Sequence, residues 1–206
     1  MSDKYQLVYA DPPWKSRNAN TGGRLKSGAA AKYKTMSTKQ LCEMPVSEII
    51  APESVLIMWY LSSMPMDAIQ VGHAWGFKKF LNINALVWEK LTKTGKPHFG
   101  MGWGTRAATE SALLMYNGSI TRQIKEKNHR NLFSAPMPVD ENGEYIHSAK
   151  PDEAYEIVEG MTGDVKRIEM FARCDERREG WDVFGNQADG SIIYEPAKFI
   201  IPKLEI

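Results

Sequence analysis

The sequence lacks the residue patterns that mark several large classes of protein. Its two cysteines, Cys42 and Cys174, lie far apart and outside any Cys-x-x-Cys pattern, so neither a disulfide framework nor a zinc site is predicted. The 4 histidines are too scattered to bind a metal ion together. No apolar run reaches the length of a membrane span, and no signal-peptide core follows Met1. These absences favour a cytoplasmic protein with no metal and no membrane partner.

The chain also lacks an excess of charge of either sign. Its formal net charge is +1 at pH 7, so any contact with nucleic acid has to come from a local patch. Neither Gly-x-Gly-x-x-Gly nor a P-loop pattern occurs, which removes the usual signatures of dinucleotide and nucleoside-triphosphate sites. What is present is a chain of 206 residues that is 43% hydrophobic, which predicts a single domain over 1–206 with a sizeable core.

The segment Asp11-Pro12-Pro13-Trp14 directly follows the apolar run 7–10, a pattern typical of a buried strand that stops abruptly. Because prolines have no N–H group, the carbonyls here are expected to face outward without neighbouring donors. Beside them stand an anionic acceptor, Asp11, and a flat aromatic side chain, Trp14. Acceptors without donors next to a stacking plane suit a planar group with an exocyclic amine, such as a nucleobase. The alternative is an ordinary proline turn with a packed tryptophan.

Apolar runs alternate with helical patterns along the chain, which predicts an α/β sheet with crossover helices. Ser37 and Gln40 fit a capping box, so a helix is expected to begin there and to run on past Leu41. Further helices are expected over 66–75 and 151–161. Strands are expected at 7–10, 55–60, 83–88, 112–116, 168–172 and 181–184.

Three segments fall outside this alternation. Residues 15–34 contain few large apolar side chains and many Gly, Lys and Arg, so we expect a mobile active-site loop. Residues 117–149 are polar and are interpreted as an irregular loop region on the substrate side. A basic cluster from Arg122 to Arg130 within it either contacts phosphates or forms a solvated face. Residues 191–206 are interpreted as a C-terminal tail.

A second group of polar residues belongs to the last two apolar runs. Glu169 and Arg173 lie in the first of these runs, and Asn186 and Gln187 follow the second. Ligands of open α/β sheets bind outside the carboxyl ends of the strands, so these side chains are candidates to hold one. Amide and guanidinium groups suit ribose hydroxyls and a carboxylate. Ordinary polar strand ends are the alternative interpretation.

Five short motifs occur in an order that resembles the MT-A70 family of adenine-N6 methyltransferases. They are Asp11-Pro-Pro-Trp14, Tyr33-Lys-Thr-Met-Ser37, Ser148-Ala-Lys-Pro-Asp-Glu153, Ile168-Glu-Met-Phe-Ala-Arg173 and Gly185-Asn-Gln-Ala-Asp-Gly190. Each motif is weak alone, but together they span nearly the whole chain. The resemblance implies a Rossmann-like fold that uses S-adenosyl-L-methionine. It also implies a permuted motif order, with the catalytic motif before the cofactor-binding motif.

The resemblance also implies site residues. Asp11 and the Pro12 carbonyl would accept hydrogen bonds from the target amine, and Trp14 would help to wall the base. With Pro13 these form the implied catalytic motif. The implied substrate-binding residues are Tyr33, Arg106 and Glu110, of which the last two alternatively form a surface pair. The implied cofactor-binding residues are Lys150, which would meet the carboxylate of S-adenosylmethionine, and Glu169, Arg173, Asn186 and Gln187.

The resulting hypothesis is an S-adenosylmethionine-dependent N6-adenine methyltransferase acting on nucleic acid. DNA is the favoured substrate because the short chain resembles bacterial and phage members of the family. An RNA adenosine methyltransferase and a cytosine-N4 methyltransferase are alternatives. A non-catalytic nucleic-acid-binding partner subunit is a further alternative, and the intact Asp-Pro-Pro-Trp motif argues against it. A homodimer is left open.

Overall fold

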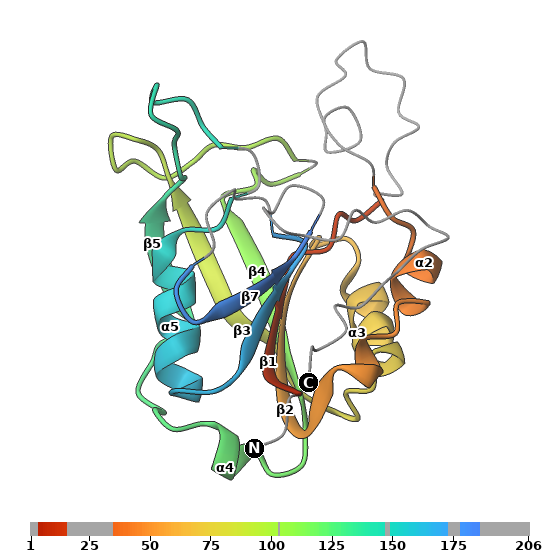
Figure 1. Cartoon of the computed structure of the whole chain (residues 1–206). Coiled ribbons are helices and arrows are strands. Elements are labelled where there is room, and N and C mark those ends of the chain that lie inside the picture. The colour runs from red at the N-terminus through yellow and green to blue at the C-terminus, as the bar shows by residue number, and fades with distance from the viewer. Residues whose placement is uncertain (1–3, 16–34, 103, 147–148, 173–177, 186–206) are drawn as a thin grey trace.

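A seven-stranded sheet forms the centre of the computed structural model, which describes residues 4–15, 35–102, 104–146, 149–172 and 178–185. The strand order is β5-β3-β4-β2-β1-β6-β7 (Figure 1). The strands are β1 Tyr5–Ala10, β2 Ile50–Tyr60, β3 Lys79–Leu91, β4 Thr109–Asn117, β5 Leu132–Pro136, β6 Arg167–Met170 and β7 Trp181–Phe184. The helices are α2 Thr38–Cys42, α3 Pro65–Ala74, α4 Ile120–Gln123 and α5 Asp152–Thr162, with a 3-10 helix at Val46–Glu48. The predicted α/β fold class is confirmed.

Strand β1 lies inside the sheet, between the parallel strands β2 and β6, and it is buried on both faces. Leu7 and Tyr9 pack on the face covered by α5, whereas Val8 and Ala10 pack on the face covered by α2 and α3 (Figure 1). A strand that is buried on both faces has a continuous apolar run instead of an alternating one. The run at 7–10 therefore marks a central strand of the fold.

One edge of the sheet holds the carboxyl ends of six strands, including β5, which is parallel to β3, and the amino end of the seventh, β4. Strands β1, β2, β6 and β7 are mutually parallel, so their carboxyl ends meet there. Strand β4 is antiparallel to β2 and β3, with Tyr60 opposite Ser111 and Glu89 opposite Thr109. The start of β4 and the end of β3 therefore lie at the same edge. This is the edge at which open α/β sheets bind ligands.

Helix α2 begins where the capping box predicts. The side-chain oxygen of Gln40 accepts a hydrogen bond from the Ser37 N–H at 3.0 Å, and the Ser37 hydroxyl accepts one from the Gln40 N–H at 3.3 Å. The helix ends at Cys42, earlier than its apolar spacing suggested, and a 3-10 turn follows. No helix in the described part of the chain is long and apolar enough to cross a membrane.

The segment 117–149 is more regular than predicted, because it contains α4 and the parallel edge strand β5. In β5 only Ala135 is buried, so the sequence shows no apolar alternation there. Helix α4 follows the end of β4, at the edge of the sheet opposite Asp11 (Figure 1). Within the basic cluster, Arg122 is paired with Glu53. A substrate-side role for the whole segment stays a prediction.

Candidate active site

The Asp-Pro-Pro-Trp segment forms a tight turn at the carboxyl end of β1. The Pro12 carbonyl accepts a hydrogen bond from the Trp14 N–H at 2.8 Å, a γ-turn whose central position suits the fixed φ of Pro13. The Pro13 carbonyl accepts one from the Met36 N–H at 2.8 Å. The expectation that these carbonyls lack donors is therefore wrong, because the chain supplies donors from nearby. Each carbonyl oxygen still has a second lone pair.

Trp14 anchors this turn to the core. Its side chain is only 5% exposed, and its indole N–H donates to the carbonyl of Trp59 at 3.0 Å. The indole packs in the cluster beneath α2 and α3. Little of the ring is open to solvent in this structure, and its predicted role in walling a base stays a prediction. Its burial holds Asp11 in place at the end of β1.

A row of four alternating charges lies at this edge of the sheet: Asp11, Lys150, Glu110 and Lys90. The Lys150 ammonium donates to Asp11 Oδ2 at 2.5 Å and lies 3.3 Å from Glu110 Oε2. The other oxygen of Glu110 contacts the Lys90 ammonium. Two carboxylates and two ammonium groups give the row no net charge. The Lys150 side chain is only 4% exposed, so this ammonium is committed to the row.

Two buried tryptophans support the cations of this row. The Lys150 Nζ lies 5.2 Å from the ring centroid of Trp59, and the Lys90 Nζ lies 5.3 Å from that of Trp88. Both rings are nearly inaccessible to solvent. Aromatic faces attract cations, most strongly where water is excluded. The rings therefore add to the carboxylates in holding each ammonium where it lies.

The row determines the charge state of its members. Burial alone would raise the pKa of Glu110, but the ammonium groups of Lys150 and Lys90 outweigh burial and lower that pKa to about 2. Burial alone would lower the pKa of Lys150, but the carboxylates of Asp11 and Glu110 outweigh it and raise that pKa. Glu110 is therefore anionic and Lys150 cationic at neutral pH.

These shifts predict how stability depends on pH. Because the pKa of Glu110 is about 2 in the folded chain and near the ordinary glutamate value of 4.5 in the unfolded chain, Glu110 stabilises the fold above pH 4.5. That contribution is lost as the pH falls toward 2. We expect the Glu110→Gln variant to show a shallower decline in the free energy of unfolding across this window than the wild type. Urea titrations at a series of pH values measure it, with the exposed Glu141→Gln as the control; equal slopes in both variants would contradict the assignment.

Glu169 is buried one residue before the end of β6. Its Oε1 accepts a hydrogen bond from the Tyr155 hydroxyl of α5 at 2.9 Å. Burial raises the pKa of Glu169, the Tyr155 hydrogen bond opposes this, and the nearby Asp11 adds to the rise. One oxygen of this predicted cofactor ligand is thus used inside the fold. Its role toward a cofactor stays a prediction.

The ends of β6 and β7 meet beside Asp11. The Asp11 N–H donates to the Met170 carbonyl at 3.3 Å, and the Ala172 N–H donates to the Phe184 carbonyl at 3.1 Å. A Cβ atom at Gly185 would lie 2.2 Å from the carbonyl oxygen of Ala172, so only glycine permits this approach. Phe171 has a φ of 70°, a strained value for a residue with a side chain. Such strain is common at functional sites.

The structure brings some of the predicted site residues together and leaves others unplaced. Asp11 and Glu110 each contact Lys150, which was predicted to meet the cofactor. Arg106 lies in the exposed loop between β3 and β4, with its guanidinium 5.0 Å from the Phe99 ring centroid. The predicted residues Tyr33, Arg173, Asn186 and Gln187, and the predicted loop 15–34 beyond Lys15, lie outside the described residues.

Lys90 is the site residue that sequence reasoning missed. It lies two residues beyond Trp88, which pairs with Glu110 across the antiparallel strands β3 and β4. Its signal in the sequence is a lysine at the end of one apolar strand and a glutamate at the start of the next. Among the described residues, no group of three His, Cys, Asp or Glu side chains is placed to hold a metal ion.

Comparison with known proteins identifies the family. A family model described as MT-A70 matches residues 5–187, which is most of the chain. The chain belongs to the MT-A70 family. The predicted family is thereby confirmed, and with it the Rossmann-like fold class and the class of enzyme, a methyltransferase.

Individual MT-A70 relatives differ in how much of their length the chain covers. The Type II methyltransferase M.MunI from a Mycoplasma species is 30% identical, over 95% of this chain and 82% of the relative. An MT-A70-like N(6)-adenosine-methyltransferase from Drosophila melanogaster is 24% identical, over 94% of this chain but 28% of the relative. The N6-methyladenosine RNA methyltransferase MTA1 of Cryphonectria parasitica is 25% identical, over 89% of this chain and 51% of the relative.

Proposed function

We propose that this MT-A70 chain transfers a methyl group from S-adenosylmethionine to the N6 amine of adenine in DNA. The observation that carries the proposal is the Asp11 carboxylate, which stands at the carboxyl end of a central strand and is oriented by the buried Lys150 ammonium. A carboxylate offers about four acceptor positions, so the bond from Lys150 leaves capacity for a substrate N–H group.

Asp11 makes a weak nucleophile reactive. The lone pair of an aromatic amine is delocalised into the ring, and hydrogen bonds from its N–H groups to Asp11 and the Pro12 carbonyl favour a pyramidal nitrogen. As the nitrogen forms its bond to the methyl carbon, the bond from that carbon to the sulfonium sulfur would break, with the sulfur leaving as a neutral thioether; the nitrogen gains positive charge, which the fixed carboxylate stabilises. The nitrogen then loses one proton, which the Asp11 carboxylate accepts and passes to solvent. Positioning of this kind is a major source of rate enhancement.

Lys150 acts in this proposal as a positioning residue. Its ammonium links Asp11 to Glu110, so the orientation of the catalytic carboxylate depends on a second carboxylate two strands away in the sheet. Glu110 in turn is held by Lys90. Because the ammonium groups of the row balance its carboxylates, Asp11 and Glu110 do not repel each other. The Asp11 carboxylate is therefore already oriented as an acceptor before the substrate binds.

The ends of β6 and β7 fit a cofactor that must approach the backbone closely. The side-chain-free Gly185 and the strained Phe171 lie there, shortly before the predicted cofactor residues Asn186 and Arg173 in the sequence. When bound, S-adenosylmethionine supplies a methyl group made electrophilic by its sulfonium. Arg173, Asn186 and Gln187 are proposed to hold its ribose. Lys150, which was predicted to meet its carboxylate, contacts Asp11 and Glu110, so we propose another donor for that carboxylate.

Substitution of the proposed ribose ligands tests the cofactor site. We expect Arg173→Ala and Asn186→Ala each to weaken S-adenosylmethionine binding by about 1–3 kcal/mol, the cost of a lost buried hydrogen bond. Isothermal titration calorimetry measures the affinity. Arg122→Ala, at the opposite edge of the sheet, is the control. Wild-type affinity in both variants would place the cofactor elsewhere.

We favour DNA over RNA because of the coverage of the relatives. The chain covers 82% of the Type II methyltransferase M.MunI, but only 28% and 51% of the two relatives named for adenosine or RNA. The deciding experiment is transfer of an isotope-labelled methyl group to DNA and RNA oligonucleotides, followed by mass analysis of the nucleosides. N6-methyldeoxyadenosine is expected. Label on cytosine, label in RNA alone, or no label would each contradict the proposal.

A further inference from the structure

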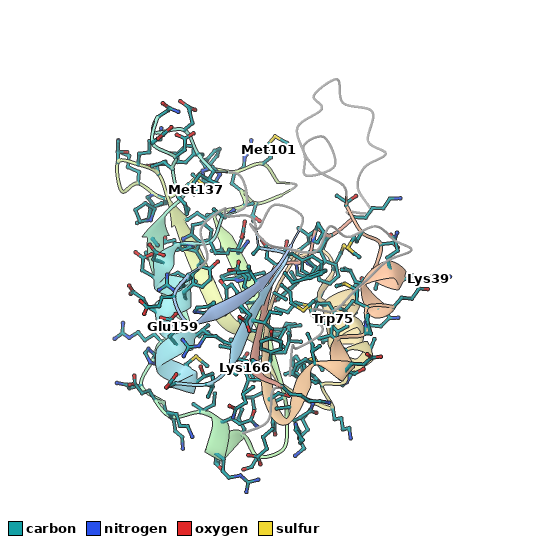
Figure 2. All side chains as sticks on the ribbon, viewed as in Figure 1. Lys39, Trp75, Met101, Met137, Glu159 and Lys166 are labelled. Atoms are coloured by element: carbon teal, nitrogen blue, oxygen red, sulfur yellow. The ribbon has the colours of Figure 1, made fainter. Side chains whose placement is uncertain are left out.

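The loop 92–108 between β3 and β4 is a surface that the catalytic row does not explain. The strand ends that flank this loop carry Lys90 in β3 and Glu110 in β4, both members of the row. Two of its large apolar side chains are strongly exposed, Phe99 at 76% and Met101 at 71%. In Figure 2, Met101 projects from the top of the molecule, at the edge of the sheet where the row lies.

The loop is held in shape by its own backbone. The Gly100 N–H donates to the Ala107 carbonyl at 3.0 Å, and the His98 N–H donates to the Lys90 carbonyl at 2.8 Å. A Cβ atom at Gly100 would lie 2.3 Å from the Ala107 oxygen, and one at Gly102 would lie 2.2 Å from the Thr105 oxygen. The two sides of the loop therefore lie so close together that only glycine fits at positions 100 and 102. These backbone contacts fix the main chain on either side of Phe99, whose side chain is exposed to solvent.

The charge of the loop has one sign. Residues 92–108 include the cations Lys93, Lys96 and Arg106 and contain no aspartate or glutamate. The Arg106 guanidinium lies 5.0 Å from the ring centroid of Phe99, so a planar cation and an aromatic ring stand together. Aromatic rings beside cationic groups are the combination that binds single-stranded nucleic acid, because bases stack on the rings while phosphates meet the cations.

We infer that the described parts of this loop, 92–102 and 104–108, form a nucleotide-binding subsite that stacks an unpaired base next to the target adenine on Phe99 and Arg106. This inference rests on the proposed function and adds to it a second contact with the same strand. Asp11 would hold the target base while Phe99 holds its neighbour. Lys93 and Lys96 would then meet the backbone phosphates of the flanking nucleotides.

Binding of short single-stranded DNA tests the subsite directly. The probe is a labelled 12-nucleotide strand with one adenine, and fluorescence anisotropy gives its Kd at several salt concentrations. We expect Phe99→Ala to weaken binding about tenfold, as for the loss of one stacked base, and Phe99→Trp to preserve binding. Lys96→Ala should lower the slope of log Kd against log salt by about 0.7, as for one lost phosphate contact. The matched control is Phe80→Ala, which removes a 43% exposed phenylalanine at the far end of β3.

A fluorescent base reports stacking separately from affinity. With 2-aminopurine placed beside the adenine, the wild type should quench its emission, and Phe99→Ala should restore the emission even at saturating protein. Equal Kd values and equal quenching in Phe99→Ala and Phe80→Ala would overturn the subsite. So would a Phe99→Ala variant that changes only the oligomeric state in light scattering, which would make the loop a contact between protein chains.

The two proposals fail in different ways. If the wild type methylates no oligonucleotide but Phe99→Ala still loses binding and quenching, the subsite stands and the proposed reaction falls. If the wild type methylates DNA and Phe99→Ala has unchanged KM and Kd, the reaction stands and the subsite falls.

Discussion

Replacing Asp11 with alanine is expected to lower the rate of methyl transfer by about 10³-fold, because removing one fixed group that stabilises transition-state charge costs rates of this order. S-adenosylmethionine binding should stay nearly unchanged, since Asp11 serves the target amine. The fold should persist, because Lys150 keeps its contact with Glu110. Single-turnover methylation of DNA, calorimetry of cofactor binding and thermal unfolding measure the three quantities.

Two further variants make this prediction specific. Asp11→Asn keeps the size of the side chain and one acceptor oxygen but removes the charge, so its rate should fall between those of the wild type and Asp11→Ala. Asp164→Ala is the matched control, because the Asp164 side chain is fully exposed and only loosely paired with Arg167 at 3.9 Å. Asp164→Ala should methylate at the wild-type rate. Measurable turnover of Asp11→Ala close to that of Asp164→Ala would remove the central assignment.

The local features of the fold could be predicted from the sequence. The continuous apolar run 7–10 indicates a strand buried on both faces, and it is one. Ser37 and Gln40 indicate a capping box, and both of its hydrogen bonds form. These predictions succeed because their physical causes, burial and capping, act within a few neighbouring residues.

The features that depend on distant partners could not be predicted. Strand β5 has one buried residue and pairs with β3 from across a long connection, so it leaves no periodic signal. Whether Trp14 packs inward or offers its ring to solvent depends on Trp59, which another strand supplies. The proline carbonyls were expected to lack donors, but Met36 brings one from a segment remote in the sequence.

The candidate site shows the same division. Residue types pointed to Asp11, and the family resemblance pointed to Glu110 and Lys150, but the sequence could not pair them. Asp11 and Lys150 are 139 positions apart and meet only because β1 ends beside the start of α5. Lys90 and the Phe99–Arg106 contact become visible only when β3 and β4 are placed side by side.

Lys150→Met tests whether the row positions the catalytic carboxylate. The variant keeps the length and much of the packing of the side chain but leaves Asp11 without its cation. We expect a rate about 10²-fold below the wild type, the lower end of the effect of losing a preorganised charge contact. The variant should also respond differently to pH. Without Lys150, burial raises the pKa of Glu110 and, of the two ammonium groups, only that of Lys90 still lowers it. Glu110 therefore binds a proton at a higher pH, and the acid limb of the pH–rate profile should move to higher pH.

Lys90→Met provides the comparison that separates positioning from general loss of charge. It removes a cation from Glu110, as Lys150→Met does, but Lys90 contacts Glu110 and lies at the end of the row away from Asp11. The acid limb of the pH–rate profile of Lys90→Met should also move to higher pH, whereas its rate at neutral pH should fall much less than that of Lys150→Met. If the two variants had equal rates and equal pH profiles, the Asp11–Lys150 contact would have no special role. A larger loss in Lys150→Met, with S-adenosylmethionine affinity unchanged, would show that Lys150 acts on the catalytic carboxylate and not on the cofactor.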